Sequence, residues 1–458
     1  MKFNCDKDQV QIVDSGTDVV RVIRNITESG FQEDAFYIFD VQDLIQKYNN
    51  WKEKLPGVVP YYAVKCNDHV SVLKTLSLLG VGFDCASKEE IKKILSIGVD
   101  ATRIIFANPA KPASHMRYAV DQGIELLTVD SENELYKIKK LHPTAKMLIR
   151  IRSDASVSQC PLGVKFGCNS VTEAPALMQL ARTLGLDVIG VCFHVGSGCG
   201  EPMAYRRAIA RAHALFQLGD ELGFNMHLLD IGGGFPGEKD SSIDTIADVV
   251  NMALEDYFPP SSNVNVIAEP GRYFVASAFT LATLVYSKRM VRDPDTGEAV
   301  NMFYINDGIY GSFNSLMYDH AVVEPIPLVN NRSYEMVPCS IWGPTCDSLD
   351  LIVERAEFPN LNVGEWIMFE NMGAYTFSAA SSFNGFPVPK VYTILNDSVK
   401  LPLKDALSAL EDEFDFEDVS QSKLNDYPLS SSWKDNQQLH GALPEIYCLE
   451  EKCPAIPI

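Results

Sequence analysis

The sequence lacks three features, each of which would have pointed to a particular class of protein. It contains 11 cysteines among 458 residues, but the number is odd and no two are spaced as CxxC, so neither a disulfide framework nor a zinc module is indicated. No run reaches the roughly 18 apolar residues of a membrane-spanning helix. The first residues lack the apolar stretch of a secretory signal, so we expect a cytoplasmic protein.

Basic residues are also scarce. Lys and Arg total 39 against 60 Asp and Glu, which gives a formal net charge of −21. Nucleic acids and anionic membranes are bound by basic patches, so neither is expected as a partner. We also expect no metal site in this protein. Hydrophobic residues make up 46% of the chain and charged residues 22%, as in a globular protein, and the length allows for two or three domains.

Between residues 59 and 271 the sequence alternates short apolar runs with amphipathic segments. The runs are VPYYAVK (59–65), VGFDCAS (81–87), RIIFANP (103–109), IELLTVD (124–130), KMLIRIR (146–152), VIGVCFHVG (188–196), MHLLDIGGG (226–234) and VNVIAEPG (264–271). Segments between them, such as HVSVLKTLSLLG, repeat apolar residues at helical spacing and close at glycine. Eight strand–helix units favour an α/β fold with a parallel (β/α)8 barrel over an open sheet, which more often has five or six strands.

The pattern changes after the barrel, which is expected over residues 42–279. Strand-like runs separated by Pro, Gly and Asn predict an all-β domain over 280–400. Residues 1–41 are expected to pair with this β domain, because AFYIFDV (35–41) precedes the first barrel unit. Residues 401–458 carry twelve acidic and four basic residues, and we expect them to form an acidic, partly ordered tail.

A (β/α)8 barrel has its active site at the carboxyl ends of its strands, and in this sequence those ends are rich in ionisable residues and glycine. The residues there are Lys65, Asp84, Asn108, Asp130, Arg150, His194, Gly232, Gly233, Gly234, Glu269, Pro270, Gly271 and Arg272. Lys65 is either an ordinary strand-end lysine that reaches solvent or a Schiff-base nucleophile whose pKa is lowered by desolvation.

Barrels frequently bind phosphate with the loops after strands seven and eight. Here those loops contain GGG at 232–234 and EPGR at 269–272. Glycines let backbone N–H groups approach an anion, and Arg272 can add a bidentate contact, although a flexible turn and a surface ion pair are the ordinary alternatives. A Schiff-base lysine beside a phosphate site indicates pyridoxal 5'-phosphate.

Such a cofactor needs further partners. Glu269 is the candidate for the pyridine nitrogen, because an acidic residue there keeps the ring protonated as an electron sink. His194 is a candidate to stack on the ring, and Ser197 is a candidate donor to the phosphate. Each also has an ordinary structural role as its alternative: a strand-end carboxylate, a hydrogen-bonded core histidine and a turn residue.

Long motifs extend this pattern from about residue 30 to 395. They are PYYAVKCN, GFDCASKEEI, VKFG, FHVGSGC, LLDIGGGFPG, AEPGRY, DGIYGSFN, YDHA, WGPTCDSLD, ENMGAYT and SFNGF. In this order they resemble the eukaryotic-type ornithine decarboxylases of the group IV pyridoxal-phosphate decarboxylases. The resemblance implies an alanine-racemase-type barrel with a C-terminal β domain and a homodimer with shared active sites. The activity it implies is the decarboxylation of L-ornithine to putrescine and CO2, the first step of polyamine biosynthesis.

The resemblance implies a role for individual residues around the cofactor. Lys65 would form the Schiff base, and Tyr375 would contact the phosphate. The expected cofactor-binding residues are Lys65, Asp84, Arg150, His194, Ser197, Gly234, Glu269, Pro270, Gly271, Arg272 and Tyr375, with Glu90 supporting them. The expected catalytic residues are Lys65, Cys346, His194 and Glu269.

The resemblance also implies that two subunits meet at each active site. Cys346 would donate a proton and Asp347 would bind the far ammonium of the substrate, both in the site of the other subunit. Asp319, with Tyr318, would add a second carboxylate. The expected interface residues are Tyr310 and Phe383, and the expected intersubunit ion pair joins Lys165 and Asp350.

Two other functions remain open. Antizyme inhibitors resemble the same sequences but are regulatory and inactive, and a damaged cofactor set would favour that function. Here the set matches the enzymes at Lys65, Asp84, Arg150, His194, Gly198, Arg272, Cys346, Asp347 and Tyr375. A lysine-active decarboxylase is the second alternative, because a pocket discriminates one methylene by only about 1–3 kcal/mol. Diaminopimelate is disfavoured, because two aspartates would repel its second carboxylate.

Two segments bear on regulation. Residues 111–146 resemble the family's antizyme-binding element, although an ordinary solvated helix face fits equally well. The basic residues in it that could meet an acidic partner are Lys111, Arg117, Lys137, Lys139, Lys140 and Lys146. Residues 153–163 (SDASVSQCPLG) differ from the usual sequence of the family, and we expect a mobile loop there.

Overall fold

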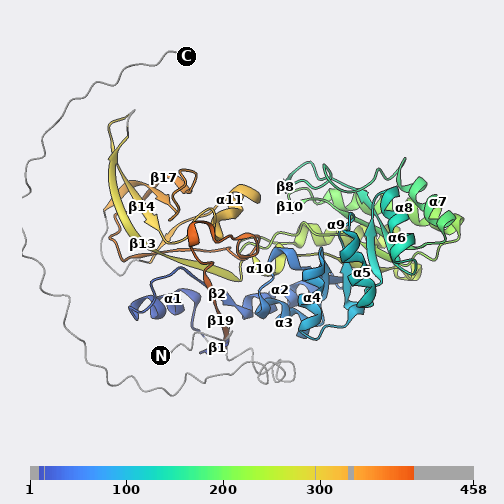
Figure 1. Cartoon of the computed structure of the whole chain (residues 1–458), viewed down its shortest axis with the longest axis horizontal. Coiled ribbons are helices and arrows are strands. Elements are labelled where there is room, and N and C mark those ends of the chain that lie inside the picture. The colour runs from blue at the N-terminus through green and yellow to red at the C-terminus, as the bar shows by residue number, and fades with distance from the viewer. Residues whose placement is uncertain (1–9, 15, 294–295, 329–334, 397–458) are drawn as a thin grey trace, which may run out of the picture. The chain divides into compact units, whose positions relative to one another are not determined.

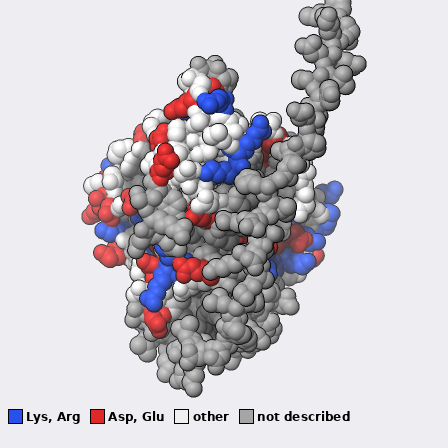
Figure 2. All heavy atoms as spheres, turned by 90° about the vertical axis from the view of Figure 1, so that its left-hand side faces the viewer, with Lys and Arg blue, Asp and Glu red and all other residues white. Residues whose placement is uncertain are grey.

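The computed structural model describes residues 10–14, 16–293, 296–328 and 335–396 of the chain (Figure 1). The predicted acidic tail, residues 401–458, lies outside the described residues. Within the described part, none of the helices has the length and apolar character needed to span a bilayer. On the face shown in Figure 2, acidic and basic side chains are interspersed among the described residues.

Eight parallel strands close into a barrel, in the order β11-β12-β3-β4-β5-β6-β7-β9. Their bounds are β3 (Val58–Ala63), β4 (Gly82–Cys85), β5 (Ile104–Phe106), β6 (Leu126–Val129), β7 (Lys146–Arg152), β9 (Asp187–His194), β11 (Leu228–Asp230) and β12 (Asn265–Ala268). Each strand lies within one of the eight apolar runs or within one residue of it, so the predicted barrel is confirmed.

Helices follow the barrel strands and cover them from outside (Figure 1). They are α2 (Val41–Lys54), α3 (Val70–Leu78), α4 (Lys88–Ser96), α5 (Ala113–Asp121), α6 (Glu132–Leu141), α7 (Ala174–Leu184), α8 (Met203–Leu222), α9 (Asp244–Tyr257) and the short α10 (Arg272–Val275). Alternate strand residues form a separate small apolar cluster that includes Ile105, Leu148, Ile189, Cys192 and Ile267, as expected when one face of each strand points inward and the other packs on helices.

The second sheet has nine strands, and its main path runs in the order β1-β19-β2-β13-β14-β16-β17. Its strands are β1 (Val10–Val13), β2 (Phe36–Asp40), β13 (Phe279–Arg292), β14 (Ala299–Ile305), β15 (Ile326–Pro327), β16 (Met336–Trp342), β17 (Leu351–Pro359), β18 (Trp366–Phe369) and β19 (Lys390–Asn396). Strand β2 pairs with β13 and β19 although it precedes the barrel in the chain. The exact domain boundaries stay a prediction.

Three elements lie outside the sequence-based expectations. Helix α1 (Val19–Glu28), which the sequence does not predict, has Asp18 as its N-cap, and the Asp18 side chain accepts a hydrogen bond from the amide of Arg21. A short helix, α11 (Ser315–Tyr318), precedes Asp319. The expected mobile loop at 153–163 contains β8 (Ser158–Cys160), which pairs antiparallel with β10 (Ser197–Cys199).

The segment between β18 and β19 returns from the sheet to the barrel. Its Tyr375 amide donates to the carbonyl of Cys66 at 2.9 Å. Buried Asn67 donates from Nδ2 to the carbonyl of Gly373 at 3.0 Å, while its Oδ1 accepts from the amide of His69, also at 3.0 Å. One buried side chain therefore ties this returning segment to the end of strand β3.

Asn67→Ala should lower the free energy of unfolding by about 1–3 kcal/mol, because it removes the hydrogen bonds to the buried carbonyl of Gly373 and to the part-buried amide of His69. A lower thermal unfolding midpoint would show this. Asn133→Ala, at an exposed position of α6, is the matched control. Equal midpoints for the two variants would contradict the role given to Asn67.

Candidate active site

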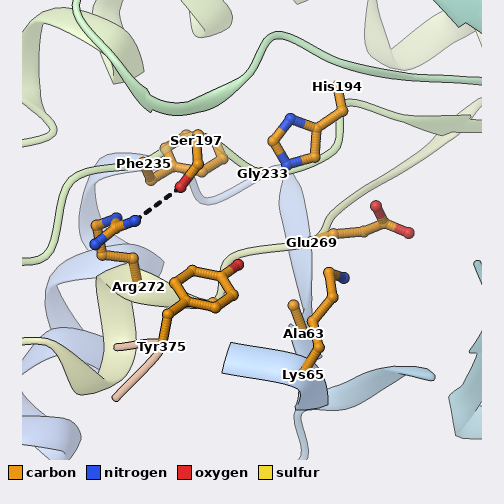
Figure 3. A pocket seen from close by; sticks show the side chains of 11 residues that line it. Ala63, Lys65, His194, Ser197, Gly233, Phe235, Glu269, Arg272 and Tyr375 are labelled. Atoms are coloured by element: carbon orange, nitrogen blue, oxygen red, sulfur yellow. Dashed lines mark hydrogen bonds between the residues drawn. The ribbon is translucent and has the colours of Figure 1, made fainter. Parts of the chain in front are cut away.

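A pocket opens at the carboxyl ends of the barrel strands (Figure 3). Its lining comes from the loops after β3, β9, β11 and β12 and from the segment that returns to the barrel. The lining residues are Ala63, Lys65, His194, Ser197, Gly233, Gly234, Phe235, Glu269, Gly271, Arg272 and Tyr375. Most of the residues expected to bind the cofactor are therefore brought together by one chain.

Lys65 lies in a single 3-10 turn (Val64–Cys66) directly after β3. Its ammonium forms an ion pair with Asp84, whose side chain on the neighbouring strand β4 is buried. Desolvation lowers the pKa of Lys65, but the charges of Asp84, Tyr375 and Glu269 outweigh it, so the pKa is raised. The expectation that desolvation leaves Lys65 with a lowered pKa is therefore wrong, because a buried carboxylate faces the amine.

Two further carboxylates, Asp230 and Glu269, interact with each other at the ends of β11 and β12. Glu269 follows β12, and its amide donates to the carbonyl of Gly232 at 2.7 Å, which links the two glycine-containing loops. Asp230 ends β11, and its Oδ1 accepts from the amide of Gly232 at 2.8 Å. Burial, followed by the charges of Asp230 and Asp84, raises the pKa of Glu269. Among the described residues, Oε1 of Glu269 has no hydrogen-bond partner.

In the glycine loop after β11 (232–234), the backbone at Gly234 packs closely against Gly196 and Tyr205. Gly234 has φ +110°, and a Cβ at this position would lie 2.6 Å from the carbonyl oxygen of Gly196 and 2.9 Å from the hydroxyl of Tyr205. The same hydroxyl donates to the carbonyl of Gly233 at 2.9 Å. Only glycine fits at position 234, and this leaves the backbone open toward the cavity.

Arg272, the first residue of α10, supplies a buried cation at this loop. Its Nη2 donates to Ser197 Oγ at 3.0 Å and to the two carboxylate oxygens of Asp319 at 2.7 and 2.8 Å. Burial lowers the pKa of Arg272, but the charge of Asp319 outweighs it, and the pKa is raised. The guanidinium carbon also lies 5.3 Å from the ring centre of Tyr375.

His194 ends β9 and lies across the cavity from Lys65, with Glu269 between them (Figure 3). Its Nδ1 accepts a hydrogen bond from the amide of Gly196 at 3.0 Å. Burial, followed by the charges of Arg150 and Lys65, lowers the pKa of His194 well below its usual value. A neutral imidazole with a fixed orientation suits stacking on a flat ring.

These residues fit pyridoxal phosphate. The unpartnered Oε1 of Glu269 can accept the N–H of a protonated pyridine ring, and Lys65 lies beside it. Arg272, Ser197 and the backbone at Gly234 lie at the opposite side of the same cavity, where a phosphate can bind (Figure 3).

A family model described as the pyridoxal binding domain of pyridoxal-dependent decarboxylases matches residues 41–276. The chain is 46% identical over 411 residues to the ornithine decarboxylase of Mus musculus, covering 86% of this chain and 88% of that protein. It is 47% identical over 386 residues to antizyme inhibitor 2 of Xenopus laevis, covering 82% of this chain and 84% of that protein. The chain belongs to the ornithine decarboxylase family.

Solved structures agree with this family and with its fold. The arginine decarboxylase of Paramecium bursaria Chlorella virus bound to agmatine is 39% identical, with a TM-score of 0.78, and the match covers 82% of this chain and all (100%) of that chain. The lysine/ornithine decarboxylase of Vibrio vulnificus complexed with putrescine is 32% identical, with a TM-score of 0.73, covering 83% of this chain and 99% of that chain.

Three of the expected cofactor residues lie outside the pocket lining. Arg150 and Asp84 do not line the cavity but lie behind it: Asp84 pairs with Lys65, and the charge of Arg150 lowers the pKa of His194. Pro270 contributes its carbonyl, which accepts from the amide of Ala63 at 3.2 Å.

Cys346 and Asp347 lie in a second cluster, away from the cavity lining. The hydroxyl of Tyr310 donates to Asp347, which lowers the pKa of that carboxylate. The rings of Tyr310 and Phe383 stack with their centres 4.3 Å apart. Cys346 is exposed. A single chain therefore assembles the cofactor residues and leaves Cys346 and Asp347 outside the pocket lining.

The expected ion pair between Lys165 and Asp350 is not made within the chain. Asp350 is buried, and its oxygens accept hydrogen bonds from the amides of Ile309 at 2.8 Å and Thr345 at 2.9 Å. Lys165 lies 5.0 Å above the ring of Phe166. The intersubunit pair stays a prediction.

Half of the basic residues expected to face an acidic partner are used inside the chain. The ammonium of Lys111 is buried and lies 3.0 Å from Glu134, which also pairs with Lys137 at 2.6 Å. Lys146 pairs with Glu125 at 2.7 Å. Lys111 is therefore not available to a partner, because it connects the ends of β5 and β6 through the carbonyls of Asn108 and Thr128.

Sequence reasoning missed Asp230. It is the last residue of β11, and the strand-end rule identifies it, but in the sequence the apolar run continues to the glycines at 232–234. Burial is the largest cause that raises the pKa of Asp230, to about 7.

Asp230 generates a prediction about pH. An unfolded Asp releases its proton near pH 4, whereas folded Asp230 retains it up to about pH 7. The folded state should therefore lose stability as the pH rises through this window. Cofactor-free Asp230→Asn should lose less thermal stability between these pH values than wild type, while Asp220→Asn, at an exposed position of α8, should follow wild type. If the unfolding midpoints of wild type and Asp230→Asn changed with pH in the same way, the raised pKa given to Asp230 would be contradicted.

Proposed function

We propose that this protein is a pyridoxal-phosphate-dependent ornithine decarboxylase, which converts L-ornithine to putrescine and CO2 and so begins polyamine biosynthesis. One observation carries the proposal: a single cavity holds Lys65, a buried carboxylate with an unpartnered oxygen, and an arginine beside a glycine loop. The relatives named ornithine decarboxylase support the choice of substrate.

When bound, pyridoxal phosphate supplies an electron sink for the electron pair left by the departing CO2. Lys65 is the residue placed to bind it covalently. Its amine must lose a proton before it can act as a nucleophile, and Asp84 is the carboxylate in contact with it. Glu269 would hold the proton of the pyridine nitrogen, because its buried oxygen has room for one donor. His194 would cover one face of the ring.

Recognition of the substrate would use two carboxylates. Asp319 reaches the cavity through Arg272, and its charge suits the terminal ammonium of ornithine. Asp347 would supply the second carboxylate and Cys346 the proton that replaces CO2 at the α-carbon. Because both lie outside the cavity of their own chain and Cys346 is exposed, we propose that they serve the site of a second subunit, which makes the homodimer the active form.

A regulatory function is the second candidate, because antizyme inhibitor 2 of Xenopus laevis is also a relative. The intact set of Lys65, Asp84, Glu269 and Arg272 favours the enzyme. An interaction with antizyme is proposed only for the exposed basic residues Arg117, Lys139 and Lys140 of the 111–146 segment. A cytoplasmic location remains part of the proposal.

Purified protein with pyridoxal phosphate should release putrescine and CO2 from ornithine faster than cadaverine from lysine or agmatine from arginine. Lys65→Ala should lose the cofactor's Schiff-base absorbance and at least about 10²-fold in rate, since a covalent route is removed. Lys92→Ala, on the exposed face of α4, is the control. Full activity of Lys65→Ala would sink the assignment, and an inactive wild type that binds the cofactor would favour the regulatory function.

Shared sites predict complementation between two inactive variants. A mixture of Lys65→Ala and Cys346→Ala subunits should regain up to roughly a quarter of wild-type activity, because one of the two sites in each mixed dimer has both residues intact. Subunit exchange should be confirmed with differently tagged chains. No regained activity after demonstrated exchange would place Cys346 in its own chain's site.

A further inference from the structure

The carboxylate of Asp319 is bound to the arginine that is expected to hold the cofactor's phosphate. Both of its oxygens accept from Nη2 of Arg272, at 2.7 and 2.8 Å, and the same nitrogen donates to Ser197. The side chains of Arg272 and Asp319 are only 7% and 6% exposed. A phosphate that bound Arg272 beside Ser197 would compete with Asp319 for Nη2 of the guanidinium.

Asp319 has a second set of contacts, which come from β8, between barrel strands β7 and β9 in the chain. Nε2 of Gln159 donates to the main-chain carbonyl of Asp319 and, at 3.4 Å, to its Oδ2. Sγ of Cys160 lies 3.6 Å from Oδ1. These contacts do not involve Arg272, so they are available to Asp319 after a phosphate has taken the guanidinium.

The backbone around Gln159 is fixed on both sides. Strand β8 pairs with β10, with Cys160 opposite Ser197. Upstream, the carboxylate of Glu201 accepts from the amide of Ser156 at 2.6 Å and from its hydroxyl at 2.8 Å. The backbone of Gln159 is therefore held by hydrogen bonds within the fold. Its partner strand β10 contains Ser197, the serine expected to bind the phosphate.

The residue beneath Gln159 is Gly198, with φ +60°. A Cβ at this position would lie 2.7 Å from Oε1 and 2.9 Å from Cβ of Gln159. A side chain at 198 would therefore displace Gln159, and glycine is what lets the amide reach Asp319.

We propose that Gln159 is a positioning residue for Asp319. It holds the main chain and carboxylate of Asp319 at the cavity when the phosphate takes Arg272, and so presents the carboxylate to the terminal ammonium of the substrate. An amide suits this role because it donates a hydrogen bond without neutralising the carboxylate that must meet a cation. The inference rests on the proposed function, in which Asp319 is a substrate carboxylate.

The test compares Gln159→Leu with wild type, with Gln179→Leu on the exposed face of α7 as the control. Gln159→Leu should raise the KM for ornithine about tenfold, the effect of losing one hydrogen bond to a charged group, while kcat and the dissociation constant for pyridoxal phosphate stay within about twofold. Gln159→Asn, which keeps the amide on a shorter side chain, should recover part of the KM.

A double-mutant cycle with Asp319→Asn shows whether Gln159 acts through Asp319. In the Asp319→Asn background, Gln159→Leu should change KM by less than about twofold, because the carboxylate it positions is gone. An unchanged KM in the single variant, or the same tenfold rise in both backgrounds, would overturn the proposal. A rise in the dissociation constant for pyridoxal phosphate to match that in KM would also overturn it, since it would indicate a general disturbance of the site.

A binding measurement separates this inference from the proposed function. Calorimetric titration of ornithine into the Lys65→Ala protein loaded with pyridoxal phosphate, with and without Gln159→Leu, gives the comparison without turnover. If wild type does not decarboxylate ornithine, the proposed function fails, while a dissociation constant for ornithine about tenfold weaker with Gln159→Leu would still support Gln159. Equal dissociation constants would overturn the inference alone.

Discussion

Closure of the barrel brings a dense set of charges to one place, several of them buried, and the site depends on their mutual neutralisation. Lys65, Arg150 and Arg272 face Asp84, Asp230, Glu269 and Asp319. These residues come from most of the length of the chain, and each would be costly to bury alone. The same charges that need the closed barrel also set the pKa values that the chemistry uses, so stability and function are coupled at this one point of the fold.

The barrel was predictable because its signal is local. Eight apolar runs and the helices between them can be read without knowing which strands are neighbours, and the rule about strand ends then names Lys65, His194, Glu269 and Arg272. Pairing between distant segments leaves no such signal. The hydrogen bond from Tyr375 to Cys66, and the contacts of Gln159 with Asp319, join residues more than a hundred positions apart. Tyr375 and Asp319 were assigned to the site from the resemblance of their motifs to the family. No pattern in the sequence assigned Gln159 to it.

Charge in the sequence also says little about charge at the surface. Lys111 was counted among basic residues open to a partner, yet a carboxylate and main-chain carbonyls enclose it. The raised pKa of Lys65 has the same origin, since its partner Asp84 is on the next strand and only folding places the two together. In both cases the sequence identified the residue, and the neighbour decided its chemical state.

The burial of Lys111 limits what amine chemistry can do to the segment from 111 to 146. Acetylating enzymes, ubiquitin ligases and amine-reactive labels all need access to the ammonium nitrogen, and this side chain is 0% exposed in the folded chain. Modification of the segment in the native protein must therefore fall on its other lysines. Modification of Lys111 would instead indicate that the segment had unfolded locally before it was modified.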